Sequence, residues 1–306
     1  MKICTANSSR GPHCQIMRIE DGFRALGHEI VLDMREADLI YQNNFWFDPI
    51  IDARKRGEVK GKLIFNVLDI PEHILTQFDL KEAEEQLLEA DAVTSISQFT
   101  KEQVNKFFNI ESSIIYQPIM DLDLTENTDN LMYDVKTNVF VHVGRRTDPN
   151  KRFNGVYNIV SHFPNYHLFT IGGENLDLGK NHTYLGSISE KLLSTYYQEA
   201  SYSFSLGKIE GLNLPVVEAI HCGSIPIIAS DLTTRQELLP AELFPEYNWF
   251  YNAENIVKFI VDMDKDPNHK KLEFKNRLKS HYEKNLKDKF NKISVAKAII
   301  DVYNKL

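Results

Sequence analysis

The chain has 306 residues, 42% hydrophobic and 25% charged, a composition typical of a soluble globular protein of about two domains. It has 35 Lys and Arg against 43 Asp and Glu, a formal net charge of −8. This argues against duplex nucleic acid as the main ligand, because such binding needs a strongly basic surface. No apolar run reaches the roughly 18–20 residues of a membrane span, and the amino terminus lacks the apolar core of a secretory signal.

The cysteines and histidines give no metal-binding pattern. Cys4, Cys14 and Cys222 are scattered, which predicts neither a disulfide framework nor a zinc site. There is no HExxH sequence, so metal-centred hydrolysis is not expected. These observations predict a cytoplasmic protein without a metal.

Short apolar runs alternate with amphipathic helical patterns along most of the chain. This alternation predicts an α/β protein with parallel sheets covered on both faces. The predicted strands are residues 2–5, 29–33, 39–42, 63–68, 92–95 and 114–116, then 139–143, 167–171, 183–185, 202–205 and 225–229. The predicted helices are residues 14–26 (ending at Gly27), one opening at Asp48-Pro49, 82–90, 100–108, 153–162, 190–200, 215–222 and 293–303.

Residues 117–137 interrupt the alternation and are acidic and polar. We interpret them as the linker between two Rossmann-like domains, residues 1–130 and 131–289, followed by a last helix at about 290–306.

Two segments are rich in basic residues. Residues 265–292 hold ten Lys or Arg against four acids, and residues 54–62 hold a second cluster. Each is interpreted as a solvated helix face, with contact to an anionic membrane surface as the alternative.

Candidate site residues follow the predicted strands, because open parallel sheets bind ligands beyond the carboxyl ends of their strands. Residues 2–5 lead into ANSSRGPH, which contains Gly11 and enters a helix. This segment is either an anion site at a helix N-terminus or an ordinary turn, and it is no dinucleotide fingerprint because GxGxxG is absent.

The strand at 139–143 ends in Gly144 and continues with Arg145, Arg146 and Lys151. Two or three cations in such a loop suit a phosphate or diphosphate; the alternative is solvated loop charge. The strand at 167–171 ends in Gly172-Gly173, which permits a close backbone approach to a ligand, or forms a plain turn.

Two carboxylates follow the strand at 202–205. Glu210 and Glu218 stand eight residues apart, with Gly211, Asn213 and Pro215 between them. These residues predict a loop and then a helix with Glu218 about one turn in. The amides of residues 212–214 would face an anion at the helix N-terminus, and the carboxylates would accept hydrogen bonds from sugar or ribose hydroxyls, unless they are surface charge.

These motifs in this order (VGRR-x4-KRFNG, TIGGE, YLGSIS and EGLNLPVVEAIHCGSIPIIAS) resemble the retaining GT-B glycosyltransferases of family four. That family's Glu-x7-Glu signature is matched by Glu210 and Glu218. Weaker likeness in the first half, at GFRALGHEIVL and EADAVTSISQFTKEQV, extends the resemblance over about residues 1–240.

The resemblance implies a GT-B fold, with two Rossmann-like domains whose parallel sheets face across a cleft. The acceptor side is N-terminal, the donor side is C-terminal, and the last helix packs back on the first domain. It implies a retaining transfer of sugar from a nucleoside-diphosphate sugar to a glycan, lipid or other hydroxyl, with no metal and no cofactor besides the donor.

The resemblance also implies residue roles. Arg145 and Lys151 would neutralise the diphosphate, Glu210 would contact the transferred sugar, and Glu218 would hold the ribose. The remaining donor-binding residues that it implies are Gly11, Gly173, Ser187, Ile188, Leu212, Asn213 and Leu214.

The sequence departs from the family's pattern in three places. Arg10-Gly11 replaces the usual glycine pair, Gly211-Leu212-Asn213 replaces a Phe-Gly, and the first-half histidine is not evident, with His73 as a substitute. The alternatives are therefore a catalytically weak binding subunit with this fold, or a sugar-nucleotide epimerase or phosphorylase.

Other candidate residues receive structural interpretations. Asp121 and Asp123 form a DxD pattern inside the linker, where no metal is expected. The histidines expected to be structural are His13, His142, His182 and His221. Acceptor choice is assigned to residues 6–13, 43–50 and 69–80, where Phe45, Trp46 and Phe47 either stack on a sugar, insert into a membrane or join the core.

Overall fold

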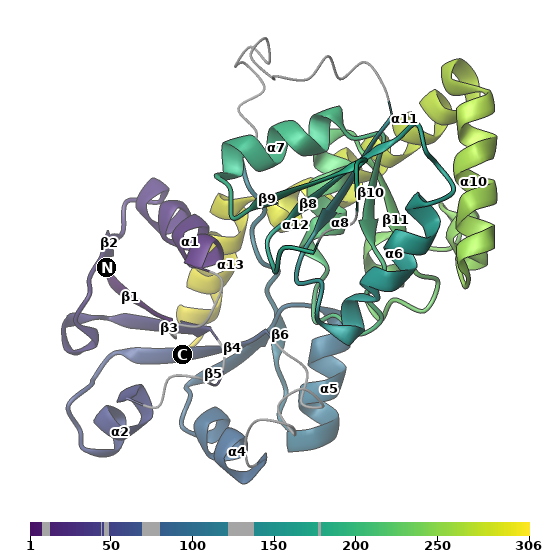
Figure 1. Ribbon diagram of the computed structural model, residues 1–306. Helices are drawn as coiled ribbons and strands as arrows, with labels where there is room; N and C mark the ends of the chain where they lie inside the picture. The colour runs from purple at the N-terminus through teal and green to yellow at the C-terminus, as the bar shows by residue number, and fades with distance from the viewer. Residues whose placement is uncertain (8–12, 44, 46–48, 69–79, 122–137, 177–178) are drawn as a thin grey trace. The chain divides into compact units, whose positions relative to one another are not determined.

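The computed structural model describes residues 1–7, 13–43, 45, 49–68, 80–121, 138–176 and 179–306 (Figure 1). Six residues that the sequence analysis singled out lie outside the described part of the chain: Gly11, Trp46, Phe47, Asp48, His73 and Asp123.

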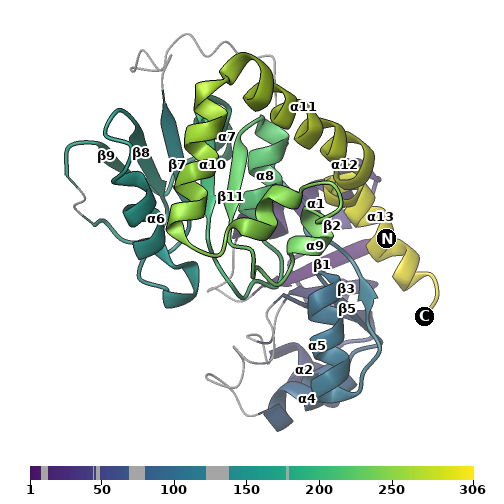
Figure 2. The same cartoon turned by 90° about the vertical axis from the view of Figure 1, so that its right-hand side faces the viewer.

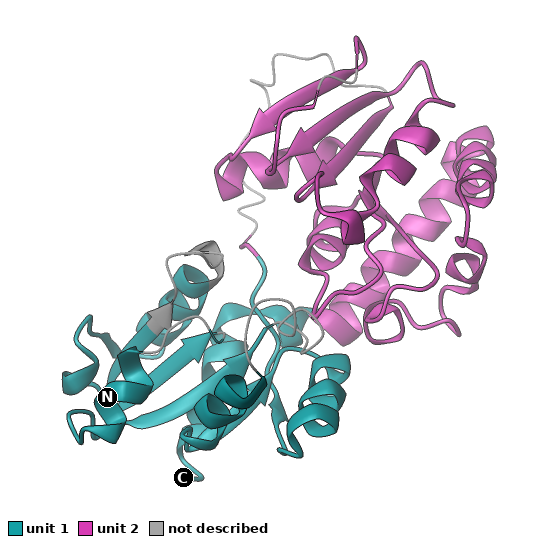
Figure 3. Cartoon of the chain, turned by 60° about the horizontal axis from the view of Figure 1, so that its bottom comes forward, with its two compact units in different colours: residues 1–119, 287–306 teal, residues 120–286 magenta. Residues whose placement is uncertain are grey.

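The chain divides into two compact units (Figure 3). Unit 1 comprises Met1–Ile119 and Lys287–Leu306, and unit 2 comprises Met120–Leu286. The first division lies earlier than the predicted boundary at 130/131. The second lies at 286/287 rather than 289/290, because the short helix that precedes the last one already packs with unit 1.

Unit 1 is built on a six-stranded parallel sheet in the order β2-β1-β3-β4-β5-β6. Its strands are β1 (Lys2–Asn7), β2 (Glu29–Ile30), β3 (Leu39–Asn43), β4 (Lys62–Val67), β5 (Ala92–Ser95) and β6 (Ser113–Ile114). Its helices are α1 (His13–Ala25), η1 (Met34–Glu36), α2 (Pro49–Lys55), α4 (Leu80–Leu88), α5 (Gln98–Phe108), α12 (Lys287–Phe290) and α13 (Lys292–Tyr303).

Helices cover both faces of this sheet. Ile19 and Phe23 of α1 and Ile299 of α13 pack with Ile3, Leu39 and Tyr41 on one face, and α2, α4 and α5 pack on the other. Helices α1 and α13 cross at Gly22, where an added Cβ would lie 2.3 Å from the Lys292 carbonyl oxygen. The last helix therefore returns to the first unit, as the resemblance implied.

Buried polar side chains link three neighbouring strands of this sheet. Asn66 donates to Asn43 Oδ1 (2.8 Å), and Thr94 donates to Asn66 Oδ1 (2.8 Å). The three residues also pair in the strand register, so each buried polar group that they share is satisfied within the sheet.

Unit 2 is built on a five-stranded parallel sheet in the order β11-β10-β7-β8-β9. Its strands are β7 (Val139–Val143), β8 (His167–Ile171), β9 (His182–Gly186), β10 (Tyr202–Ser205) and β11 (Ile225–Ile228). Its helices are η2 (Pro149–Lys151), α6 (Phe153–Val160), α7 (Glu190–Glu199), α8 (Leu214–Cys222), α9 (Arg235–Leu238), η3 (Pro245–Trp249), α10 (Ala253–Lys265), η4 (Pro267–Lys271), α11 (Leu272–His281) and η5 (Tyr282–Leu286).

The alternation of side chains along β7 separates the two layers of unit 2. Val139 and Val141 pack with Tyr197 of α7 and Ala219 of α8. His142 faces the other way and lies against Phe153 of α6, and α10 lies beside α6 (Figure 2). Because both faces are covered, the open positions are at the ends of the strands.

Predicted and observed elements agree in type. The strand predicted at 225–229 ends one residue early, and two further strands differ more clearly from the prediction. The strand predicted at 29–33 ends at Ile30, because Asp33 caps the 3₁₀ helix η1 by accepting from Arg35 N–H. The strand predicted at 114–116 is only β6. Gly27, with φ +80°, follows α1 as the predicted C-terminal cap.

Candidate functional site

The loop after β7 carries two adjacent arginines whose environments differ. The Arg145 side chain is 72% exposed and donates to Asp148 Oδ2 (3.1 Å). Arg146 is buried, with its guanidinium 4.6 Å from the centre of the Tyr184 ring. None of its guanidinium nitrogens has a hydrogen-bond partner among the described residues. Only Arg145 is therefore presented to a ligand from solvent.

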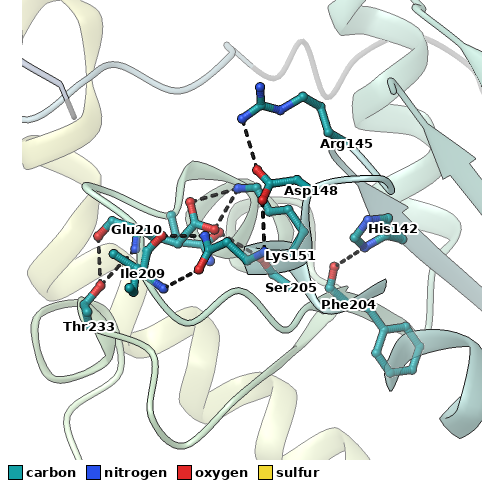
Figure 4. Close-up of polar contacts among 11 residues, drawn as sticks. His142, Arg145, Asp148, Lys151, Phe204, Ser205, Ile209, Glu210 and Thr233 are labelled. Atoms are coloured by element: carbon teal, nitrogen blue, oxygen red, sulfur yellow. Dashed lines mark hydrogen bonds and ion pairs between the residues drawn. The ribbon is translucent and has the colours of Figure 1, made fainter. Parts of the chain in front are cut away.

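The same loop turns back to place Lys151 against Glu210 (Figure 4). Lys151 Nζ lies 2.7 Å from Glu210 Oε1 and 2.9 Å from Oε2, and the two side chains are 25% and 12% exposed. An ion pair that is partly shielded from solvent interacts more strongly than one on the open surface. An ammonium has three donors, so one remains for a ligand beyond this carboxylate.

Glycine at position 207 makes room for the Glu210 carboxylate. A Cβ there would lie 2.2 Å from Glu210 Oε1, closer than any side chain tolerates. The backbone of Gly207 is not in the left-handed region, so the requirement is for space alone.

Helix α8 carries the second carboxylate, as predicted. Pro215 lies in its first turn and Glu218 is 5% exposed, one turn in. Burial and the Glu218 charge raise the pKa of the Cys222 thiol. The amide of Leu214 donates to the Leu212 carbonyl within the same loop (3.2 Å). The expected contact of the amides of residues 212–214 with an anion stays a prediction.

Asn213 precedes α8 and places a buried amide beside β10. Ser205 Oγ donates to its Oδ1 (2.9 Å), and Asn213 is 2% exposed. Its Nδ2 has no partner among the described residues. A buried N–H group without a hydrogen-bond acceptor lowers the stability of the fold. An acceptor on a bound nucleotide sugar would satisfy it, which agrees with the expected role of Asn213.

Gly173 brings the loop after β8 against the loop after β7. Its φ is +62°, and a Cβ would lie 2.9 Å from Arg145 Cα and from the Gly144 carbonyl oxygen. Thr147 Oγ1 donates to Glu174 Oε1 (2.8 Å) across the same junction, and this hydrogen bond holds the pKa of Glu174 below its usual value. Glycine is therefore required both for conformation and for space.

The remaining predicted donor residues follow β9. Ser187 is exposed and Ile188 packs partly on the core of unit 2, after Gly186 with φ +66°. The structure thus brings Lys151, Glu210 and Asn213 to the same edge of the sheet as Arg145, Gly173 and Ser187. Gly11 lies outside the described residues.

Three further loop contacts were not predicted from the sequence. Asn150 and Thr233 hydrogen bond to the backbone next to Glu210, and Arg152 pairs with Asp231 at 2.8 Å through both of its terminal nitrogens. Arg152 belongs to the KRF of the quoted basic motif, which does not indicate its partner Asp231. No motif marks Asn150 or Thr233, and all of these partners are distant in the sequence. The only available signal was that each follows a predicted strand.

The described histidines have structural environments. His142 Nδ1 lies 3.2 Å from the Phe204 carbonyl oxygen, and burial lowers the pKa of His142 to about 4. His182 Nε2 lies 2.8 Å from Thr170 Oγ1, and the His221 ring lies against Tyr282. The side chain of His13 lies outside the described residues.

Phe45 and the basic residues near Asp91 have structural roles. Phe45 is buried against Phe65, which answers the three alternatives for this residue in favour of the core. Arg54 and Lys62 both pair with Asp91 (3.0 and 3.3 Å).

The basic stretch at 265–292 is partly paired as well. Lys270 and Lys271 pair with Asp262 and Asp264, each at 2.8 Å. Membrane contact by this stretch stays a prediction. In the described part of the chain, no helix has both the length and the apolar character to cross a membrane, and no cluster of three potential metal ligands occurs.

Comparison with known proteins places the fold. No protein-family model matches the sequence, and no curated protein matches it. Solved structures do match along almost the whole chain. A sucrose-phosphate synthase from Thermosynechococcus elongatus is 14% identical with TM-score 0.77, covering 99% of this chain and 98% of its own.

Two of the matching structures contain a nucleotide sugar. HepE from Anabaena in complex with UDP-glucose is 15% identical with TM-score 0.74, and 100% of each chain is covered. The trehalose-6-phosphate protein from E. coli bound with UDP-2-fluoro glucose is 10% identical with TM-score 0.69, covering 100% of this chain and 99% of its own. The chain therefore has the α/β GT-B fold, with two Rossmann-like parallel sheets.

Proposed function

We propose that this protein is a glycosyltransferase that uses a nucleoside-diphosphate sugar as donor. The observation that carries the proposal is the pairing of Lys151 with Glu210 at the carboxyl edge of the second sheet. Arg145 lies in the same loop as Lys151, and the helix bearing Glu218 follows Glu210 directly.

The fold supports this proposal without specifying the donor. Structures with the same fold at 10–15% identity contain UDP, UDP-glucose or UDP-2-fluoro glucose. Fold likeness by itself does not fix function, so the weight rests on the charged residues at the sheet edge.

The cations would act on the donor diphosphate. Arg145 offers a planar fork and Lys151 a point charge, and both suit phosphate oxygens. When the sugar leaves, negative charge develops on the departing diphosphate, and donors already in place stabilise it without reorganising. Gly173 would allow the backbone to approach this group closely.

The carboxylates would act on hydroxyls. We assign Glu210 to the transferred sugar and Glu218 to the ribose, because an ionised carboxylate accepts up to four hydrogen bonds. Leu212, Asn213 and Leu214 would contact sugar or phosphate, and Ser187 and Ile188 the nucleobase. Since the Leu214 amide is already bonded to Leu212, the Asn213 side-chain amide is the stronger donor candidate.

The stereochemistry and the metal requirement are part of the same proposal. We expect retention of the anomeric configuration, transfer to a sugar or lipid-linked hydroxyl, and activity in the presence of EDTA. Proton NMR of a freshly formed product distinguishes the two anomers. An inverted product, or activity that EDTA abolishes, would contradict these parts.

The test begins with thermal shift against UDP, GDP, ADP, TDP and CMP and their sugar conjugates. A ligand at 100 times its Kd adds about 2.7 kcal/mol of stability. One nucleotide should stabilise selectively, and Arg145→Ala should lose that shift. Arg56→Ala is the matched control, because Arg56 is also exposed and paired with a neighbouring carboxylate, Glu58, in unit 1.

Two outcomes would count against the transferase. No response to any nucleotide at millimolar concentration would remove the donor site. Selective nucleotide binding with no transfer and no donor hydrolysis would instead favour a binding subunit that has kept the fold.

A further inference from the structure

The backbone beside Glu210 is held on one side by Asn150. The side chain of Asn150 donates from Nδ2 to the Ile209 carbonyl (2.6 Å) and accepts from the Ile209 N–H at Oδ1 (2.9 Å). The Asn150 carbonyl also accepts from Lys208 N–H (3.3 Å). One side chain thus bonds to both polar groups of the residue that precedes Glu210.

Thr233 holds the other side of the same segment (Figure 4). Its Oγ1 accepts from Glu210 N–H (3.0 Å) and donates to the Glu210 carbonyl (2.9 Å). Its own N–H donates to the Lys208 carbonyl (2.9 Å). Residues 208–210 belong to no helix or strand, so these contacts replace the ladder that regular structure would provide.

This bracing bears directly on the Glu210 carboxylate. Lys151 follows Asn150 in the chain, so Asn150 ties the backbone that carries the ammonium to the backbone that carries the carboxylate. The carboxylate also lies against Gly207, where a Cβ would come within 2.2 Å of Glu210 Oε1. A backbone shift at residue 210 would therefore break the match between Glu210 and Lys151.

We propose that Asn150 and Thr233 are positioning residues for sugar transfer, an inference that rests on the proposed function. They fix the backbone of residues 209 and 210, and through it the Glu210 carboxylate, without touching the donor themselves. A misplacement of about 1 Å at a reacting centre costs on the order of 100-fold in rate.

The decisive variant is Thr233→Val, which keeps the shape of threonine and removes both hydroxyl hydrogen bonds. We expect turnover, followed as release of nucleoside diphosphate from UDP-, GDP-, ADP- and TDP-glucose, to fall about 10- to 100-fold. The Kd for the free nucleoside diphosphate should not rise, because Arg145 and Lys151 remain and a displaced Glu210 carboxylate would offset less of the Lys151 charge. Asn150→Ala should act in the same direction.

Two variants serve as controls. Thr233→Ser keeps the hydroxyl and should restore turnover. Thr234→Val alters the next residue, whose buried hydroxyl has no partner among the described residues, and should leave turnover unchanged. A loss shared by Thr233→Val and Thr234→Val would indicate general disturbance of the loop and overturn the positioning role.

Amide hydrogen exchange gives a readout that needs no donor. Peptides covering residues 209–210 should exchange faster in Thr233→Val than in the wild type or Thr234→Val, and unchanged exchange would overturn the bracing. If the wild type is active and neither Thr233→Val nor Asn150→Ala lowers its turnover, the positioning role alone is overturned. A wild type that neither binds nor cleaves any of these donors overturns the proposed function, and the positioning role with it.

Discussion

Lys151 Nζ donates to both carboxylate oxygens of Glu210, at 2.7 and 2.9 Å, across 59 residues of sequence. The two residues meet because β7 and β10 are parallel neighbours, so the loops that follow them leave the same edge of the sheet. The Glu210 carboxylate offsets the positive charge of Lys151 at the place where the anionic nucleotide sugar is expected to bind.

This pairing gives Glu210→Gln a two-sided outcome. Removing the carboxylate charge leaves the Lys151 ammonium uncompensated, so the affinity for free UDP should rise, on the order of tenfold. Turnover should fall on the order of 100-fold, because an interaction that orients the sugar is lost. Isothermal titration with UDP and a donor-hydrolysis assay measure the two effects separately.

Two variants frame that result. Lys151→Met should weaken UDP binding, which is the opposite of the effect expected for Glu210→Gln. Glu254→Gln breaks an exposed ion pair with Lys258 (2.8 Å) elsewhere in unit 2 and should change neither quantity. Weaker UDP binding by Glu210→Gln would show that the carboxylate does not offset the Lys151 charge.

Gly207→Ala should disturb the site while the protein stays folded. The added Cβ would meet Glu210 Oε1 at 2.2 Å, so the carboxylate must shift from its place against Lys151, and turnover should fall on the order of 100-fold. Gly155→Ala in α6 is the matched control, because its Cβ would have only an ordinary contact at 3.4 Å with Leu206. Equal turnover in the two variants would refute the spatial role of Gly207.

Gly22→Ala should weaken the attachment of α13 to unit 1. Alanine favours a helix over glycine by about 1 kcal/mol, yet here its Cβ would lie 2.3 Å from the Lys292 carbonyl oxygen and 2.9 Å from Ala296 Cβ. Overpacking of this kind costs about 1–3 kcal/mol, so net destabilisation is expected. Urea unfolding measures it, with Gly155→Ala as the helical glycine that should gain stability; a stabilised Gly22→Ala would contradict the tight crossing.

His142 should make the stability of the fold depend on pH. Burial lowers its pKa from 6.5 to about 4, partly offset by the hydrogen bond with the Phe204 carbonyl and reinforced by the charges of Arg146 and Lys151. The unfolded chain then binds the proton more readily than the folded protein. The contribution of neutral His142 to the unfolding free energy is therefore fully present above pH 6.5, and it is lost as the pH falls toward 4, at about 1.4 kcal/mol per pH unit.

Comparison of the wild type with His142→Gln isolates this effect. The other titrating groups are common to both proteins, so only the difference in slope of unfolding free energy against pH belongs to His142. The wild type should lose more stability between pH 6.5 and 4.5 than the variant. Parallel curves would mean that the His142 ring is not held neutral by its surroundings.

The sequence predicted the elements around the candidate site because local signals define them. Buried β-branched and aromatic runs marked β7, β8 and β10 at their observed ends, and Pro215 marked the start of α8. It overextended β2, since the competing cap at Asp33 depends on a side-chain contact with Arg35 that periodicity does not report.

What the sequence alone determined is the alternation of strands and helices, the two Rossmann-like halves, and the charged residues that follow their strands. These depend on hydrophobic period and turn chemistry, which act between near neighbours. Only the tertiary structure decided that Arg145 is exposed while Arg146 is buried, that Lys151 pairs with Glu210, and that Asn150 and Thr233 hold the loop between them. Those contacts join loops that are distant in the chain, and the order and register of the parallel strands bring the loops together.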